Sequence, residues 1–431
     1  MITNNRLGII IVRKRTPQEW LVLGFLLMPF AFAFLTDLLR LPSFIRYLMD
    51  LLVVGLSMML FVKRYFIISS KARPMLTLAV VFFLYILVAY LFNYQSLFYF
   101  VWGTRNTFRF YLAFLVYVAY VTEEDANQWL RFLDVLFWLN LVVSIYQFAI
   151  LRVHQDLLGG IFGVNATANG YTLVFFCIVI GKSLFQAFEG KENFLYCALK
   201  CLGSLVVAAM AELKFYYVAL ILILAITACL TRISRKKIAL LIIVIVGVII
   251  GASLLTFWFS EFEGFLSLEK LWELATKENY SSNKDLNRLS AIYTLMNNYV
   301  TDVGQQLFGL GLGNCDMSDV AIFNSTFYQN YSYLHYTWFG SAMIFLETGF
   351  VGLAMYLLFF VLCIVYSFKQ FKRHTGNKLF CQISILMAFM CIAITFYSAS
   401  LRFEAGYMAY FALALPFIRG KSDAATVNNA R

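Results

Sequence analysis

Five positively charged side chains interrupt or flank apolar stretches at widely separated positions of the sequence. Arg105 and Arg109 are four residues apart in one apolar run, so they share a face of a helix. Lys214, Arg288 and Arg402 stand near the ends of other apolar or amphipathic segments. A charge in or beside hydrocarbon costs roughly 2.5–3.5 kcal/mol on insertion scales and usually marks a site. Because guanidinium groups bind phosphate oxygens bidentately, a converging set of this kind predicts an anion pocket suited to a lipid pyrophosphate.

A simpler interpretation of the same cations is that each forms a local ion pair. Oppositely charged residues close in sequence, and especially three or four apart on a helix, commonly pair in this way. The combinations with suitable spacing are Lys214–Glu212, Arg402–Glu404, Arg46–Asp50 and Arg131–Asp134. For the cations predicted to bind pyrophosphate, the sequence leaves both interpretations open.

Attack by a hydroxyl group requires a general base, and a few side chains near the same segments qualify. His335 lies in the tyrosine-rich stretch YSYLHYTWFG and titrates near neutrality. Glu347 lies about one turn inside an apolar run, where an unpartnered acid is costly. The alternatives are an interfacial aromatic-belt role for His335 and an ion pair with an outer arginine for Glu347. Asp316, Asp319 and His154 are weaker candidates.

Asparagines in glycine-rich segments are candidates for binding ligand hydroxyls. They are Asn165, Asn169 and Asn314. Asparagine also tolerates unusual backbone angles, so a turn role is the alternative. The alternating glycines of LFGLGLGN (307–314) indicate a tight backbone path, and they match neither a Walker loop nor a dinucleotide fingerprint. The cysteines have no zinc spacing and no acidic metal triplet is evident, so we expect neither a metal nor another cofactor.

The elements that position these residues are predicted to be transmembrane helices. The sequence is 62% hydrophobic and 13% charged, whereas soluble domains are roughly 45–50% apolar and about 25% charged. The predicted fold is therefore an all-α, polytopic bundle of about 12 spans (10–12). The apolar runs are 20–38, 44–62, 75–92, 98–121, 129–151, 171–188, 194–212, 215–230, 238–259, 343–366, 380–398 and 404–418.

Lysine and arginine cluster in alternate connections, which predicts that both termini are cytoplasmic. This bias also explains the net charge of +11 without nucleic acid. The chain then divides into nine spans (1–259), a large extracytoplasmic loop (260–334), and three spans with a cytoplasmic C-terminus (335–431). The loop contains two amphipathic helical patterns, 266–276 and 286–300, and Asp285 is a plausible N-cap of the second.

Four local patterns resemble the bacterial O-antigen polymerase and O-antigen ligase superfamily. They are GGIFGVNATANG (159–170), AELKFYYVAL (211–220), NRLSAIYTLMNN with LFGLGLGN (287–314), and FLETGFVGL (345–353). With about twelve spans and one large late loop, the resemblance covers most of the chain. It implies a metal-independent glycosyltransferase of the bacterial inner membrane, acting on glycans carried by undecaprenyl pyrophosphate. Arg288 and Lys214 occupy positions where such proteins carry functional cations.

The resemblance favours a polymerase of O-antigen or capsular polysaccharide over a ligase. Ligases of this superfamily typically show a His-Asn pair close before the Glu-x-Gly pattern, whereas His335 stands twelve residues before Glu347 and is followed by Tyr336. The alternatives are an O-antigen ligase that uses lipid A core as acceptor, and a transporter of lipid-linked sugars. The expected partners are an undecaprenyl-pyrophosphate-linked oligosaccharide, membrane lipid and possible chain-length regulator proteins.

Overall fold

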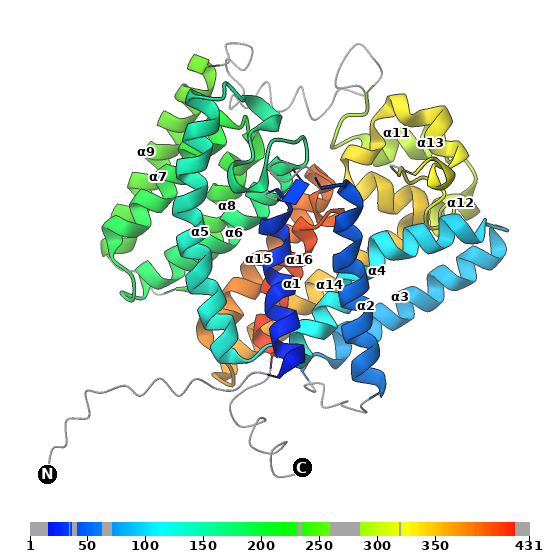
Figure 1. Cartoon of the computed structure of the whole chain (residues 1–431), viewed down its shortest axis with the longest axis horizontal. Helices are drawn as coiled ribbons and strands as arrows, with labels where there is room; N and C mark the ends of the chain where they lie inside the picture. Colours follow the sequence, from blue (N-terminus) through cyan, green and yellow to red (C-terminus); the bar gives the residue numbers. More distant parts are fainter. Residues whose placement is uncertain are drawn as a thin grey trace, which may run out of the picture.

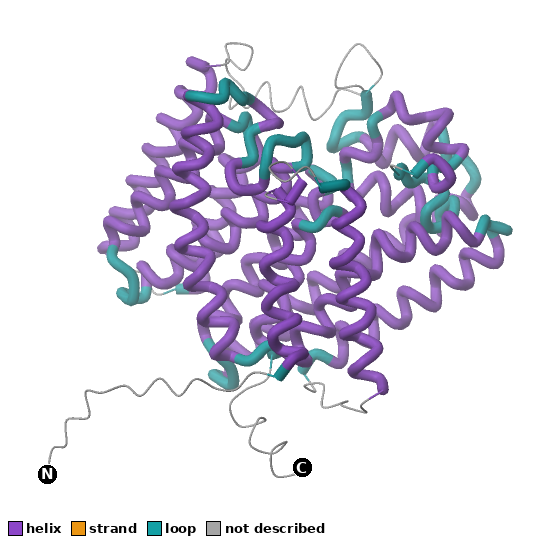
Figure 2. The backbone as a smooth tube through the Cα atoms, in the orientation of Figure 1, coloured by secondary structure: helices purple, strands orange, loops and turns teal. Residues whose placement is uncertain are grey.

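A computed structural model of the chain describes residues 16–33, 35–36, 41–62, 71–231, 235–258, 285–318 and 320–418. Within these ranges the chain is helical and has no strand (Figures 1 and 2). The long helices are α1 (Pro17–Ala33), α2 (Tyr47–Val62), α3 (Arg73–Phe92), α4 (Leu97–Tyr120), α5 (Glu123–Ala149), α6 (Ala168–Phe188), α7 (Phe194–Met210), α8 (Lys214–Leu230), α9 (Arg235–Trp258), α14 (Gly340–Arg373), α15 (Lys378–Tyr397) and α16 (Ala405–Ala414).

Each predicted apolar run coincides with one of these helices, and the all-helical prediction is confirmed for the described residues. Six of the helices are long and apolar enough to cross a membrane: α2 together with the preceding turn, α3, α5, α6, α14 and α15. Shorter apolar helices are α1, α7, α8 and α16 with the turn that follows it. These helices indicate a multi-pass membrane protein, whereas the count of about twelve spans stays a prediction.

The bundle has a buried centre and an apolar outer surface. Helix α16 is buried along its whole length, and α4 is buried almost continuously from Asn106 to Ala119. The outer helices expose large apolar side chains instead, such as Leu51, Leu84, Val135 and Ile249. An exposed apolar surface of this kind suits lipid rather than water. The central helices are therefore the ones that can hold polar groups away from lipid.

Helix α14 is broken near its start. Gly349, inside the helix, has a φ of 65° and a ψ of −170°. With a rise of about 1.5 Å per residue, it lies about 14 Å along the helix from the first residue, Gly340. The glycine loop 307–314 packs against this break, where the Leu310 and Gly311 amides donate to the carbonyls of Leu346 and Glu347 at 2.8 and 3.1 Å. The break thus releases backbone acceptors that the loop satisfies, which is the condition for irregular backbone inside a bundle.

Short helices cluster at one end of the bundle, at the upper right of Figure 1. They are α11 (Ala291–Asn298), α12 (Val303–Phe308) and α13 (Thr326–Tyr331). The amphipathic pattern predicted for 286–300 forms α11, but its N-cap is Ser290. The prediction that Asp285 caps this helix is therefore wrong, because a turn at 288–290 separates the two. The pattern at 266–276 lies outside the described residues.

Candidate functional site

Asp50 of α2 gathers cations from α4. Its Oδ2 accepts from Arg105 Nε and Nη2 at 2.7 and 2.5 Å, and its Oδ1 accepts from Arg109 Nη1 at 3.2 Å. The hydroxyl of Tyr407 donates to the same Oδ1 at 2.6 Å. The other neighbours of Arg109 are the Glu404 carboxylate at 3.4 Å and the Arg402 carbonyl at 2.6 Å. Both oxygens of Asp50 are therefore occupied by groups of the protein itself.

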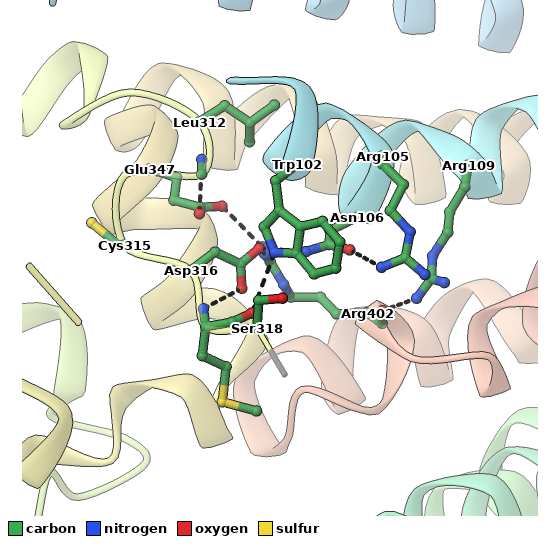
Figure 3. A network of polar contacts seen from close by, with 12 residues as sticks. Trp102, Arg105, Asn106, Arg109, Leu312, Cys315, Asp316, Ser318, Glu347 and Arg402 are labelled. Carbon is green, nitrogen blue, oxygen red and sulfur yellow. Dashed lines mark hydrogen bonds and ion pairs between the residues drawn. The ribbon is translucent and has the colours of Figure 1, made fainter. Parts of the chain in front are cut away.

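Arg402, in the turn that follows α15, lies between two carboxylates (Figure 3). Its Nη1 donates to Glu347 Oε2 at 3.1 Å, and its Nη2 donates to Asp316 Oδ2 at 2.9 Å. The other carboxylate oxygen of Glu347 accepts from the Gly313 amide at 3.0 Å. Asn106 links this cluster to the previous one, because its Nδ2 donates to Asp316 Oδ2 at 2.6 Å and its Oδ1 accepts from Arg105.

Together these side chains form one buried ion network, drawn from α2, α4, α14, the glycine-loop segment and the two turns around Arg402 and Glu404. We call it the ion network; its charged members are Asp50, Arg105, Arg109, Asp316, Glu347, Arg402 and Glu404. Three of the five predicted cations thus lie close together, and all three have carboxylate partners. Positive charge that is already compensated attracts an external anion weakly.

The electrostatics of Glu404 illustrate this compensation. Arg109 Nη1 lies 3.4 Å from Glu404 Oε1. Tyr171 of α6 donates to Glu404 Oε2 at 2.5 Å. Glu404 therefore helps to keep Arg109 in place, which is a structural role.

The local ion pairs suggested by sequence spacing form in only one case. Lys214 Nζ lies 2.9 Å from Glu212 Oε1. The prediction is wrong for the side chain of Arg402, which turns away from Glu404 to Asp316 and Glu347. It is also wrong for Arg46, because Arg105, Arg109 and Tyr407 already occupy Asp50.

The remaining spacing prediction, Arg131–Asp134, is wrong because Asp134 pairs with buried lysines. Lys182 and Lys200 both contact its carboxylate, and Lys200 also lies 2.7 Å from Glu192. Lys182 stands eleven residues after Tyr171 on α6, about 16 Å along the helix. This second cluster is thus separate from the ion network and joins α5, α6 and α7.

Arg288 contacts a pair of stacked aromatic rings, one of which is the sequence neighbour of Lys214. The Arg288 guanidinium sits over the Tyr397 ring at 4.1 Å from its centroid. Tyr397 in turn stacks on Phe215, with centroids 4.1 Å apart and an interplanar angle of 17°. Arg288 therefore lies at the end of helix α15 and close to the start of helix α8, where Lys214 is located. Lys214 retains 25% of its side-chain exposure.

His335 forms a histidine–carboxylate pair. Its Nδ1 lies 2.7 Å from Asp285 Oδ1, and its ring stacks on Trp338 at 4.1 Å and 20°. Since a carboxylate only accepts, Nδ1 carries the hydrogen, and in the neutral ring Nε2 is then the basic nitrogen. The side chain is 40% exposed. Asp285 stands three residues before Arg288, at most about 11 Å of extended chain away. We call Lys214, Asp285, Arg288 and His335 the Arg288 group.

Two of the three predicted sugar-binding asparagines stabilise turns. Asn165 accepts from the Thr167 amide at 3.1 Å and from its hydroxyl at 2.6 Å, and Asn314 Nδ2 donates to the Leu310 carbonyl at 2.6 Å. Asn169 differs, because its amide donates to Asp156 and to the Ala211 carbonyl, next to Glu212. Its buried Oδ1 has no partner among the described residues.

Sequence reasoning missed the acids Asp50 and Glu404, which it assigned to local pairs, and Asp285, which it assigned to a helix cap. An acid inside an apolar run is itself a signal of a buried polar site, and Asp50 carries that signal. Nothing in the sequence identifies Asp285 as the partner of His335, because fifty residues separate them.

Chemically, the Arg288 group offers a partly exposed imidazole paired with a carboxylate, together with two cations, whereas the ion network offers charges that neutralise one another. The first arrangement can accept a proton from a hydroxyl and hold a departing anion. The second can fix the relative positions of α2, α4, α14 and α16. A scan against protein-family models and a search of characterised proteins both find no match to this chain.

Proposed function

We propose that this chain is a polymerase of lipid-linked glycans, acting on the face of the membrane where α11, α12 and α13 lie. The carrying observation is the Arg288 group: an imidazole oriented by Asp285, with Arg288 on the same short segment and over Tyr397, which stacks on Phe215, the sequence neighbour of Lys214. The local sequence patterns of the O-antigen polymerase and ligase superfamily point to the same activity. The product is then O-antigen or capsular polysaccharide.

In the proposed reaction, the donor is a growing glycan on undecaprenyl pyrophosphate and the acceptor is a hydroxyl of a lipid-linked repeat unit. His335 Nε2 takes the proton of that hydroxyl, whose oxygen forms a bond to the anomeric carbon of the donor. The bond from that carbon to the phosphate oxygen breaks, and undecaprenyl pyrophosphate leaves with both bonding electrons. Arg288 and Lys214 stabilise its developing negative charge, so the step needs no strong acid.

Asp285 is a positioning residue in this proposal, because its carboxylate selects the tautomer of His335. The ion network holds α14, the glycine loop and the Arg402 turn together. Glu347 then has a structural role, since Arg402 and the Gly313 amide occupy both its carboxylate oxygens. Asn169 is the remaining candidate for a sugar hydroxyl, because its Oδ1 has no partner among the described residues.

A second candidate function is transport of lipid-linked sugars, and the break in α14 favours it. Secondary transporters bind substrates at discontinuous helices near the bilayer midplane, often beside buried charges. Gly349 interrupts α14 next to the buried Glu347. In this protein, however, the break is filled by the glycine loop, and the buried charges have partners in the protein.

Deletion of the gene and complementation with variants distinguishes these activities through surface glycan length on a gel. Loss of a polymerase leaves single capped repeat units, loss of a ligase leaves no repeat units on the core, and loss of a transporter strands them inside the cell. We expect single repeat units after deletion and after Arg288→Ala, with Arg131→Ala as an exposed-arginine control. An unchanged ladder in R288A would count against the proposal.

A further inference from the structure

The end of α14 that lies away from the glycine loop carries three cations. Lys369, Lys372 and Arg373 stand in its last two turns, and all three side chains are exposed. The helix has 34 residues, so it measures up to about 50 Å, whereas the hydrocarbon core of a bilayer is roughly 30 Å thick. The charged end of α14 can therefore extend into the head-group region of the membrane.

An exposed apolar face of α14 leads directly to these cations. Leu358, Val361, Val365 and Phe368 are three or four residues apart, so they share one face, and all are exposed. Lys372 continues the same spacing, and its Nζ lies 4.7 Å from the centroid of the Phe368 ring. Because an exposed apolar face of a membrane helix contacts lipid tails, the cation at its end lies at the level of the lipid head groups.

The start of α3 adds two further cations to this surface. Lys71 Nζ donates to the Thr375 carbonyl at 3.3 Å, in the turn that follows α14. Arg73 is exposed and begins α3, which packs against α14. With the predicted orientation, this surface faces the cytoplasmic leaflet. We define the basic patch as Lys71, Arg73, Lys369, Lys372 and Arg373.

The protein does not neutralise the basic patch. In the described ranges, none of its cations forms an ion pair with a carboxylate. Neighbouring lysines at the same end behave differently, because Lys191 and Lys378 both contact the Glu189 carboxylate at 2.8 Å. Glu123, another acid at this end, accepts from the Asn377 side chain at 2.8 Å. Positive charge therefore remains exposed at the membrane boundary, where an external anion can pair with it.

From this arrangement we infer that the basic patch binds the head groups of anionic phospholipids. Phosphate oxygens accept charge-assisted hydrogen bonds from lysine and arginine, and a negatively charged leaflet attracts each nearby cation. The ammonium groups of Lys369 and Lys372 lie over the rings of Tyr366 and Phe368, at 4.9 and 4.7 Å from the centroids. Both charges are therefore held at the edge of the apolar face, where the head groups of the surrounding lipid lie.

This site is separate from the Arg288 group. Helix α15 begins at Lys378, shortly after the end of α14, and it ends at Tyr397, the residue under the Arg288 guanidinium. The two ends are nineteen residues apart, about 28 Å along the helix. The inference therefore goes beyond the proposed glycan chemistry, and either can fail without the other.

The test measures the affinity of the purified full-length protein in detergent for phosphatidylglycerol, zwitterionic phosphatidylcholine and free glycerol 3-phosphate. One variant combines Lys369→Gln, Lys372→Gln and Arg373→Gln, and the control Lys191→Gln removes a lysine that has a carboxylate partner. We expect the triple variant to bind phosphatidylglycerol about 100-fold more weakly, because each cation near an anionic leaflet contributes about fivefold. The affinity for phosphatidylcholine should be the same in all three proteins.

Equal affinity of the wild type for phosphatidylglycerol and phosphatidylcholine would overturn the inference, as would wild-type affinity in the triple variant or an equal loss in K191Q. Glycerol 3-phosphate binding as tight as that of phosphatidylglycerol would assign the patch to soluble anions and overturn the lipid assignment. If the triple variant does not fold, the salt dependence of wild-type binding decides. The affinity for phosphatidylglycerol should fall as sodium chloride screens the exposed charges, and salt-independent binding would contradict the inference.

Discussion

At the scale of single residues, the predicted site cations are of two kinds, and the sequence does not distinguish them. Arg105, Arg109 and Arg402 are bound to carboxylates on other elements, and they are largely buried. Arg288 instead lies over the ring of Tyr397, which stacks on Phe215. We therefore expect substitutions in the first set to disturb folding and substitutions in the second set to disturb activity.

Replacement of His335 by alanine is expected to lower the rate of glycan polymerisation by roughly 10²–10⁴-fold, the usual contribution of a general base. His154 provides the matched control, since it is exposed and its ring only packs edge-on against Phe148 at 4.8 Å. Polymer formation in membranes that contain each variant checks this. Wild-type rates in H335A would exclude the base role.

Asp285→Asn keeps the shape of the positioning residue but removes its charge. Without the carboxylate, the neutral imidazole of His335 loses its preference for the tautomer with a basic Nε2, so the rate of polymer formation in membranes that contain the variant should fall. A wild-type rate in D285N would contradict the positioning role.

Cys315 is expected to resist thiol reagents in the folded protein. Burial, helped by the nearby Glu347 and Asp316 carboxylates, raises the pKa of its thiol well above the usual range, and only the thiolate reacts. In a variant without other cysteines, maleimide at pH 7.5 should modify Cys315 only after unfolding in detergent. A cysteine introduced at the exposed Val303 should react at once. Rapid modification of native Cys315 would contradict its burial.

From the sequence we could identify the polar residues that lie inside apolar segments, but not the residues with which they pair. Spacing of four residues correctly put Arg105 and Arg109 on one face, where both reach Asp50. The same spacing wrongly paired Arg46 with Asp50, because tertiary contacts from α4 and α16 outweigh a local pair worth about 0.3–0.5 kcal/mol. Contacts between Arg402 and Asp316, eighty-six residues apart, have no local signal.

At the level of elements, the glycine loop and the broken α14 depend on each other. Gly313 has a φ of 88°, and a Cβ there would lie 1.9 Å from the Tyr99 carbonyl oxygen. Gly349 has the same constraint against the Leu307 carbonyl group, with contacts at 2.3 Å. Gly313 therefore lets the glycine loop lie against α4, and Gly349 lets the same loop lie against the break in α14. This interlock holds Glu347 and Asp316 at Arg402.

Gly313→Ala is therefore expected to abolish folding or reduce it severely. The left-handed backbone costs an alanine roughly 1–2 kcal/mol, and the overlap with Tyr99 adds about 1–3 kcal/mol. Gly24→Ala in α1 is the control, because a Cβ there meets nothing within 4 Å and helix propensity improves. The folded fraction after size-exclusion chromatography compares the two. A normal yield of G313A would show that the loop is looser than described.

Element identity was predictable because lipid as a solvent requires long apolar helices, and each of those runs is helical. The tight path of LFGLGLGN was predictable from its glycines. The break at Gly349 was not, since a glycine in an apolar run equally fits an unbroken helix. The cap at Asp285 failed because a turn at 288–290 separates this residue from α11.

At the scale of the whole molecule, polar groups are concentrated at the centre and apolar side chains cover the outside. The buried helices α4, α6 and α16 supply Arg109, Tyr171 and Tyr407 to the ion network. The outer helices α2, α3, α5 and α9 expose leucine, valine and isoleucine. This distribution fits a lipid environment, in which unpaired polar groups are costly.

Reporter fusions test the predicted orientation. A reporter that is active only in the cytoplasm should be active when fused after Arg431, and one that requires export should be active when inserted at Val303. Val303 is exposed at the start of α12, so an insertion there is tolerated more readily. If the same reporter were active at both sites, after Arg431 and at Val303, the two sites would lie on one side of the membrane and the predicted topology would be wrong.

Polymerisation by the purified protein tests the central claim most directly. The wild-type chain, H335A and H154A are reconstituted in liposomes with undecaprenyl-pyrophosphate-linked repeat units from the source organism, and product length is read on a gel. The account predicts a ladder of long glycans with the wild type and H154A, and single repeat units with H335A. Single repeat units with the wild type, or an equal ladder with H335A, would contradict it.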